Sequence, residues 1–183
     1  ILFFFFFCSV SVSAQQLRVR VFSQQKIKQT SFVPSFGRYS VEIDGNLTRL
    51  SRTSNVKLSA LNGKVEVRIN DSVFANSEKV TFKSEGIKSF FRLKPIAPEI
   101  AERRYDDALE VSVNGNGNLL LINVVEQENY IAGVVQSETW GATKNIDFFK
   151  VQAICCRNYL FRNMNKHSKD GYILSHRLKF DNK

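Results

Sequence analysis

One acidic residue, Glu138, follows an apolar helical pattern in the second half of the sequence. Ile131, Val134 and Val135 lie at spacings i, i+3 and i+4, and Glu138 follows at i+7, so all four share one face of a predicted helix. A carboxyl group held against apolar neighbours keeps its proton near neutrality, which is what a general acid at a glycosidic oxygen needs. The same pattern also fits an ordinary helix-end glutamate that reaches solvent or pairs with a lysine, and it leaves both interpretations open.

A second helix is predicted from about Asn145, which suits the N-cap position, with Asp147 in the first helical turn. Between the two helices, the segment 140–143 reads Trp-Gly-Ala-Thr and predicts a break. The apolar stripe of the second helix consists of Phe149, Ala153, Cys156, Leu160 and Met164.

Each helix carries a motif. Residues 128–138 read Glu-Asn-Tyr-Ile-Ala-Gly-Val-Val-Gln-Ser-Glu, and residues 149–159 read Phe-Lys-Val-Gln-Ala-Ile-Cys-Cys-Arg-Asn-Tyr. Both segments resemble the family of stage II sporulation protein D (SpoIID) and LytB, which has Gly-Val-Val before Pro-Ser-Glu-Met and then a Gln-Ala run ending in Arg-Thr-Tyr. Three upstream segments resemble the strand pair that leads into these helices: Arg104–Tyr105, Leu109–Val111 and Asn123–Val125.

The resemblance implies a peptidoglycan lytic transglycosylase in which Glu138 is the catalytic residue. The reaction would cut the bond between N-acetylmuramic acid and N-acetylglucosamine, with Glu138 protonating the leaving oxygen and then taking a proton from the muramyl C6 hydroxyl. No water attacks, so the second carboxylate of hydrolytic glycosidases is not obligatory, but Glu128 and Asp147 stay open as partners. The alternative is a non-catalytic wall-binding module that enhances a partner amidase, as LytB-type members are described to do.

The same resemblance implies substrate-binding residues near Glu138. Gln152 and Arg157 match the second motif, and their separation corresponds to about 140° of rotation on a helix. We therefore expect one of them to line the groove and the other to brace the fold. Trp140 could stack on a sugar face or pack as a helix-end core residue, and Tyr159 ends the motif.

The chain departs from the family pattern at Gln136, where the family has proline, and at Thr139 and Trp140, which replace methionine and proline. Residues 104–183 are expected to be a truncated family core, because the chain reaches Lys183 before the family's Gln-x-Tyr motif. Two histidines, His167 and His176, do not provide a zinc ligand set and are predicted to be loop residues. Neither a metal ion nor another cofactor is predicted.

From Leu17 to about Ile122 the pattern is mainly that of strands, with apolar and polar residues alternating. Turn signals separate them at Asp44–Asn46, Asn62–Gly63 and Ser84–Gly86, and the clearest hairpin surrounds residues 114–118, Asn-Gly-Asn-Gly-Asn. The predicted fold class is therefore α+β: an antiparallel β-rich region over residues 15–103, followed by a helical layer that carries the glutamate. A plain carbohydrate-binding β module would explain the strands but not the helical motif.

The first 14 residues predict export. They are uncharged, include five consecutive phenylalanines and end in small residues before Gln15, which is typical of a signal peptide remnant and too short for a membrane-spanning helix. Cys8 lies in this segment, and the adjacent pair Cys155 and Cys156 suits neither a mutual disulfide nor zinc.

The net charge is +9, and the excess of lysine and arginine is spread along the chain. This distribution mostly indicates a solvated surface, and no basic stripe interleaved with aromatics indicates nucleic acid. The family resemblance implies peptidoglycan glycan strands as the partner and, for the alternative function, a cell-wall amidase. The composition predicts no nucleic-acid partner and no stable transmembrane anchor.

Overall fold

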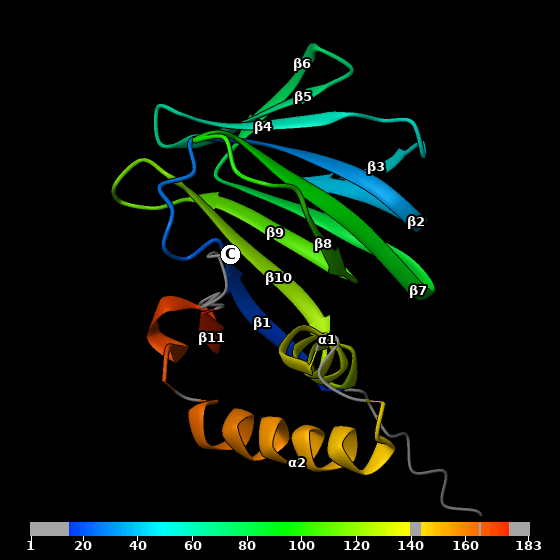
Figure 1. The fold of residues 1–183 in the computed structure, drawn as a ribbon. Helices are drawn as coiled ribbons and strands as arrows, with labels where there is room; N and C mark the ends of the chain where they lie inside the picture. The colour runs from blue at the N-terminus through cyan, green and yellow to red at the C-terminus, as the bar shows by residue number, and fades with distance from the viewer. Residues whose placement is uncertain (1–14, 140–143, 165, 176–183) are drawn as a thin grey trace, which may run out of the picture.

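The computed structural model describes residues 15–139, 144–164 and 166–175. It contains a large sheet with two helices at one end (Figure 1). The strands are β1 (Gln16–Val21), β2 (Gln29–Ile43), β3 (Asn46–Leu50), β4 (Val56–Leu61), β5 (Lys64–Ile69), β6 (Ser72–Ser77), β7 (Lys79–Ala97), β8 (Arg103–Asp106), β9 (Ala108–Val113), β10 (Leu119–Glu126) and β11 (Leu174–Ser175). The helices are α1 (Gln127–Thr139), α2 (Ile146–Asn163) and a short 3₁₀ helix, η1 (Ser168–Asp170).

The sheet confirms the predicted α+β class. Its hydrogen-bonded order is β11-β1-β10-β9-β7-β2-β4-β5-β6, with β3 beside β2 and β8 beside β7. All described pairings are antiparallel except that of β1 with β11. Strands on both sides of position 103 pair within this one sheet, and the division of the chain there stays a prediction. The predicted signal segment, residues 1–14, lies outside the described residues.

Two of the predicted turns form tight hairpins because their central residues adopt left-handed backbone angles. Asp44 and Gly45 have φ of 49° and 81°, and Asn62 and Gly63 have φ of 51° and 77°, as a two-residue turn of type I′ requires. The clearest predicted hairpin, around residues 114–118, is confirmed as the connection between β9 and β10.

The prediction of a turn at Ser84–Gly86 is wrong, because these residues lie inside β7. Opposite them, the register of β2 shifts between Phe36 and Arg38. A glycine inside a strand commonly marks such an irregularity, and Gly86 adopts φ of 105°. Here the sequence signal marks a bulge in a continuous strand rather than its end.

Buried side chains form two clusters. The larger one lies within the sheet and includes Phe32 stacked between Phe82 and Phe91, with ring centroids 4.0 Å and 4.9 Å away. The smaller one joins the helices to the end of the sheet and consists of Leu17, Val19, Val125, Ile131, Leu160 and Leu174. Because β1, β10 and β11 supply four of these six residues, this end of the sheet positions both helices.

Candidate active site

Helix α1 begins directly after β10, and its start is held by neighbouring loops. The backbone N–H of Gln127 donates to the carbonyl of Gln15 at 2.9 Å. The carboxylate of Asp107 accepts from the backbone N–H of Glu126 at 2.8 Å and from the side chain of Asn129 at 3.3 Å. Asp107, which lies between β8 and β9, therefore links this loop to the junction of β10 and α1.

Helix α2 begins where the sequence predicted. The Asn145 side chain accepts a hydrogen bond from the backbone N–H of Asp147 at 2.9 Å, so the N-cap is confirmed. The helix then packs Leu160 into the smaller core cluster, with Ala153 and Cys156 partly buried against it. The predicted apolar stripe is thus the face by which α2 contacts the rest of the molecule.

Two polar contacts link the helices, and each joins one motif to the other. Gln152 donates from Nε2 to Oε2 of Glu138. Arg157 donates from a guanidinium nitrogen to Glu128 at 2.7 Å. Gln152 and Arg157 thus contact different glutamates of α1.

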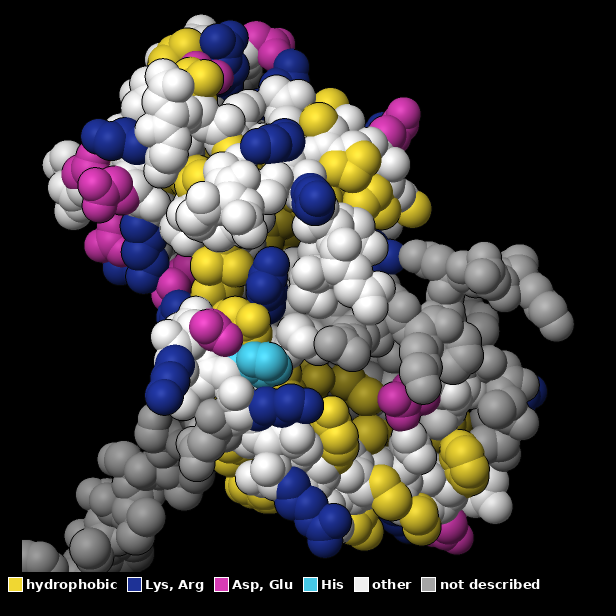
Figure 2. Space-filling view, turned by 90° about the vertical axis from the view of Figure 1, so that its left-hand side faces the viewer, with side chains coloured by type: hydrophobic (Ala, Val, Ile, Leu, Met, Phe, Trp, Pro, Cys, Tyr) yellow, Lys and Arg dark blue, Asp and Glu magenta, His cyan; other side chains and the backbone are white. Residues whose placement is uncertain are grey.

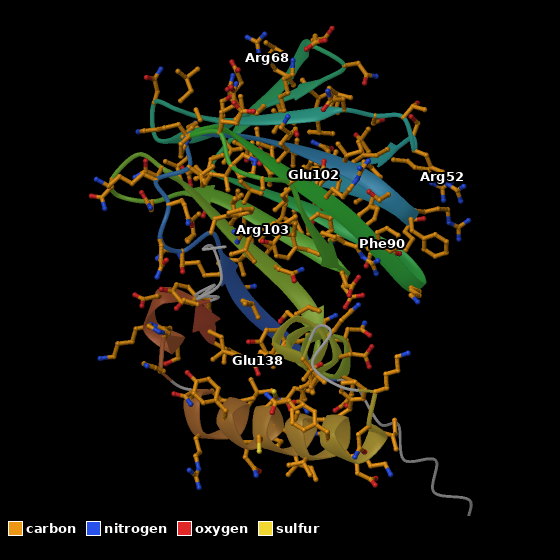
Figure 3. The ribbon with its side chains drawn as sticks, in the orientation of Figure 1. Arg52, Arg68, Phe90, Glu102, Arg103 and Glu138 are labelled. Carbon is orange, nitrogen blue, oxygen red and sulfur yellow. The ribbon has the colours of Figure 1, made fainter. Side chains whose placement is uncertain are left out.

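Glu138 lies at the junction of α1 and α2 (Figure 3). The prediction that it points into apolar surroundings is wrong, because the residue is exposed. Ile131, seven positions earlier, is buried against the sheet. Over those seven residues α1 advances about 10 Å along its axis, which brings Glu138 beside α2 rather than over the core.

The Tyr130 hydroxyl and the Cys156 thiol lie close enough to Glu138 to be affected by its charge. Burial raises the pKa of the Tyr130 hydroxyl to about 12, with smaller contributions from Cys156, Tyr159 and Glu138. Burial also raises the pKa of the Cys156 thiol, and Glu138 adds to this effect. Tyr130 therefore stays protonated at neutral pH and presents an uncharged hydroxyl near Glu138.

A groove of about 610 Å³ opens between α1 and α2. Arg157 and Glu128 lie in its wall, but Glu138 and Gln152 are not among its lining residues. This helix groove is lined by Glu128, Ile131, Ala132, Val135, Gln136, Thr139, Phe149, Lys150, Ala153 and Arg157. The predicted catalytic carboxylate therefore does not line this groove between the helices.

The remaining predicted residues have varied positions. Tyr159 is 61% exposed on α2 and close enough to Tyr130 to affect its pKa. Asp147 contacts Lys150 on its own helix at 2.9 Å. Trp140 lies outside the described residues.

His167 stacks on the ring of Tyr172, with centroids 5.0 Å apart, and its Nδ1 lies 3.5 Å from the Asp170 carboxylate. Figure 2 shows a histidine side chain in cyan next to hydrophobic side chains in yellow. His176 lies outside the described residues. Within the part of the chain that the structure describes, no three His, Cys, Asp or Glu side chains gather closely enough to hold a metal ion.

The sequence reasoning missed Tyr130 and Asp107. Tyr130 lies four and eight positions before Val134 and Glu138, a spacing that places residues near one helix face, so its position relative to Glu138 could have been found. Asp107 acts from a loop that contacts α1 only in the folded chain, and no local pattern indicates it.

The fold and the site define an α+β protein in which two successive helices dock at the end of a sheet and meet through an acid–amide contact. Residues 115–180 match the family model described as stage II sporulation protein, SpoIID. The family predicted from the motifs is thereby confirmed over the segment that runs from the β9–β10 hairpin through both helices. No curated protein and no solved structure matches the chain. None of the described helices is long and apolar enough to cross a membrane.

Proposed function

We propose that this protein is a peptidoglycan lytic transglycosylase in which Glu138 serves as general acid and then as general base. The observation that supports this most is the hydrogen bond between Glu138 and Gln152, because it joins the acidic residue of one family motif to the glutamine of the other. The family match covers both residues.

The reaction needs one carboxyl group in two protonation states. As an acid, Glu138 gives its proton to the glycosidic oxygen while the bond between that oxygen and the muramyl C1 breaks. As a carboxylate, it takes the proton of the C6 hydroxyl, whose oxygen forms the new bond to C1. Gln152 engages Oε2, and an amide N–H donor stabilises the carboxylate that forms after the first transfer.

A single carboxylate suffices for this scheme because no water has to be activated. The two other acidic residues considered near the site are held by cations: Glu128 by Arg157 and Asp147 by Lys150. The net charge of +9 favours approach of the protein to anionic wall polymers, and export to the cell envelope is part of the proposal.

The test is Glu138→Gln in the full chain, assayed on glycan strands without stem peptides. This substitution keeps the size of the side chain but removes its transferable proton, so turnover should fall by about 10²–10⁴-fold. Glu128→Gln is the matched control, since Glu128 also lies on α1 and also contacts α2, and its turnover should stay close to wild type. Mass spectrometry of the wild-type products should show anhydro-muramyl ends, which are lighter by one water than reducing ends.

Two outcomes would contradict the proposal. Reducing ends in the wild-type products would indicate a hydrolase. An absence of cleavage by wild type, with equal stimulation of a wall amidase by wild type and by Glu138→Gln, would establish the enhancer function instead.

A further inference from the structure

A cavity of about 210 Å³ lies between α1 and the end of the sheet, where β1 and β10 run up to the helix (Figure 1). Its walls come from β1, β8, β10 and α1, and we call it the sheet cavity. The described residues of α1 that line it are Asn129, Tyr130, Gly133, Val134 and Ser137, none of which lines the helix groove. The volume is below the roughly 300–1,000 Å³ of sites that enclose a small molecule, so the cavity suits one substituent of a longer ligand.

The sheet cavity leads toward Glu138. Val134 lines the cavity and lies one helical turn before Glu138, so the two residues share one side of α1. Tyr130 also lines the cavity, and the charge of Glu138 contributes to the raised pKa of its hydroxyl. A ligand with one substituent in the cavity therefore has its neighbouring atoms close to the Glu138 carboxyl group.

The interior of α1 contains a glycine that no neighbouring atom requires. A Cβ added at Gly133 would have no other atom within 4 Å, and glycine destabilises a helix interior relative to alanine. Gly133 lies four positions from both Asn129 and Ser137, on the side of α1 that lines the cavity. A side chain at this position would extend into the cavity, so the glycine keeps it open.

The wall formed by β8 contains a buried hydroxyl group without a partner. The ring of Tyr105 packs against Phe22 and Phe91, with centroids 6.0 Å and 5.9 Å away, and within the described part of the chain its hydroxyl has no hydrogen-bond partner. Burial raises the pKa of this hydroxyl to about 12, and Arg103 opposes that effect. A guanidinium group can only donate, so Arg103 provides no acceptor for the phenol proton. An unpaired buried donor costs free energy, which a carbonyl oxygen in the cavity would recover.

The walls of the sheet cavity suit an uncharged group that has both polar and apolar parts. Arg104 and Asp106, which also line it, are paired with each other at 3.4 Å. Tyr105 and Tyr130 stay protonated at neutral pH, because burial raises both pKa values to about 12. Val134 adds apolar surface. An acetamido group matches these walls, since it combines a carbonyl acceptor, an N–H donor and a methyl group without a charge.

We propose that the sheet cavity binds the acetamido group of the N-acetylated sugar whose glycosidic bond lies beside Glu138. The acetamido carbonyl accepts from the Tyr105 hydroxyl, and the methyl group packs against Val134. This inference rests on the proposed function, from which it takes the substrate class. Holding the acetamido group fixes the sugar relative to the carboxyl group, and such positioning favours proton transfer to the glycosidic oxygen.

Filling the cavity tests the proposal through binding, without a need for catalysis. Isothermal titration calorimetry on the full chain with Glu138→Gln compares a β-1,4-linked tetramer of N-acetylglucosamine with cellotetraose, which has the same linkage but a hydroxyl in place of each acetamido group. The acetylated tetramer should bind at least about tenfold more tightly. Adding Gly133→Leu should remove this preference, because the leucine side chain occupies the cavity.

The matched control is Gly115→Leu in the same background. Gly115 also has no atom within 4 Å of an added Cβ, but it lies in the hairpin between β9 and β10, and both affinities should stay unchanged. Thermal unfolding should show that Gly133→Leu melts no lower than its parent, since leucine favours a helix more than glycine does. An acetamido preference that survives Gly133→Leu, or no preference in the parent, would overturn the proposal.

Tyr105→Phe provides a second test that leaves the cavity open. It keeps the ring that packs against Phe22 and Phe91 and removes only the unpaired hydroxyl, so the melting temperature should not fall. Affinity for the acetylated tetramer should fall about tenfold, while affinity for cellotetraose stays the same. Unchanged affinity for the acetylated tetramer would refute the assigned contact.

The binding data and the cleavage assay separate this inference from the proposed function. Cleavage of glycan strands by wild type, without any acetamido preference in binding, would refute the subsite and leave the transglycosylase proposal standing. A preference that Gly133→Leu abolishes, in a protein whose wild type cleaves no glycan, would support the subsite and refute the transglycosylase.

Discussion

The Glu138 carboxylate accepts its hydrogen bond from an amide, not from a cation. A lysine or arginine at position 152 would favour the charged form of Glu138 strongly, and would thereby oppose the acid half of the proposed reaction. An amide supplies a directed donor without a full charge. The contact therefore suits a carboxyl group that has to act in both protonation states.

Gln152→Leu is expected to lower turnover while leaving the fold intact, because the residue is only partly buried. A hydrogen bond to a charged group contributes about 1.5–3 kcal/mol, which corresponds to about 10–150-fold in rate. Steady-state kinetics on glycan strands measure this loss, and Gln136→Leu, an exposed site on α1, is the control. Equal activity of Gln152→Leu and wild type would show that Gln152 does not contribute to the chemical step.

The position of Cys156 near Glu138 leads to a prediction that does not require activity. Burial and then the Glu138 charge raise the pKa of the Cys156 thiol, and only the thiolate reacts with iodoacetamide. At mildly alkaline pH, Glu138→Gln should therefore speed alkylation of Cys156 but not of the exposed Cys155. Peptide mass spectrometry reads both rates separately, and an unchanged Cys156 rate would show that the carboxylate does not influence the thiol.

At the scale of elements, the carboxylate of Glu110 links several strands in the part of the sheet near the helices. Arg18 of β1 donates two hydrogen bonds to Glu110 of β9, at 2.7 Å and 2.8 Å, and Lys79 of β7 approaches Glu110 at 3.0 Å. Arg18 also donates to the carbonyl of Gly171, at 2.6 Å. These contacts link three strands to the segment that precedes β11.

This network predicts a pH dependence of stability. Burial raises the pKa of Glu110, but the hydrogen bonds and charges of Arg18 and Lys79 outweigh burial, so the net pKa lies below its ordinary value of 4.5. The stabilisation is therefore fully present above pH 4.5 and is lost as the pH falls through the lower, folded-state value. Urea unfolding from pH 7 to pH 3 should show a weaker pH dependence for Glu110→Gln than for wild type. Parallel curves for the two proteins would contradict the linkage.

Gly37 of β2 is expected to be intolerant of any side chain. It has φ of +81°, and an added Cβ would lie 2.2 Å from the Ser89 hydroxyl oxygen and 2.8 Å from the Ser89 Cβ. Gly37→Ala should therefore lower the free energy of unfolding by about 3 kcal/mol or more, from backbone strain and overpacking together.

Gly63→Ala separates the two causes, because Gly63 also has a positive φ, +77°, but no atom within 4 Å of the added Cβ. It should cost about 1 kcal/mol from strain alone. Thermal or urea unfolding measures both variants, and equal losses would show that the contact with Ser89 relaxes freely.

The sequence predicted the elements best where the local pattern and the packing agree. The alternation of Leu17, Val19 and Val21 predicted β1, and all three side chains are buried. It failed at Ser84–Gly86, because a turn and a bulge use the same residue types and only the pairing with β2 distinguishes them. The prediction of a buried Glu138 also failed. Helix periodicity predicts which residues share one face of α1, but it does not predict how far along that face α2 covers them.

At the scale of the whole molecule, the proposed export of the protein predicts the residue at which the mature chain begins. Strand β1 starts at Gln16, directly after the predicted signal segment, so cleavage before Gln15 would leave every described strand intact. N-terminal sequencing of the secreted protein should therefore begin near Gln15. A secreted form that retains the run of phenylalanines would contradict this expectation.

The pairing of β1 also has a consequence for the order of folding. Gln16 lies opposite Glu126 in the antiparallel pairing of β1 with β10, and Val19 lies opposite Leu174 in its parallel pairing with β11. Both pairings therefore close loops of more than a hundred residues. The β4–β5–β6 hairpins join neighbours in sequence and form much sooner, because short loops cost less entropy to close. β1, the first of the described strands, should thus complete its pairing late, and pulse-labelled hydrogen exchange should show its amides protected after those of β5. Until that step, the helices that carry Glu138 and Gln152 have no finished sheet edge on which to dock.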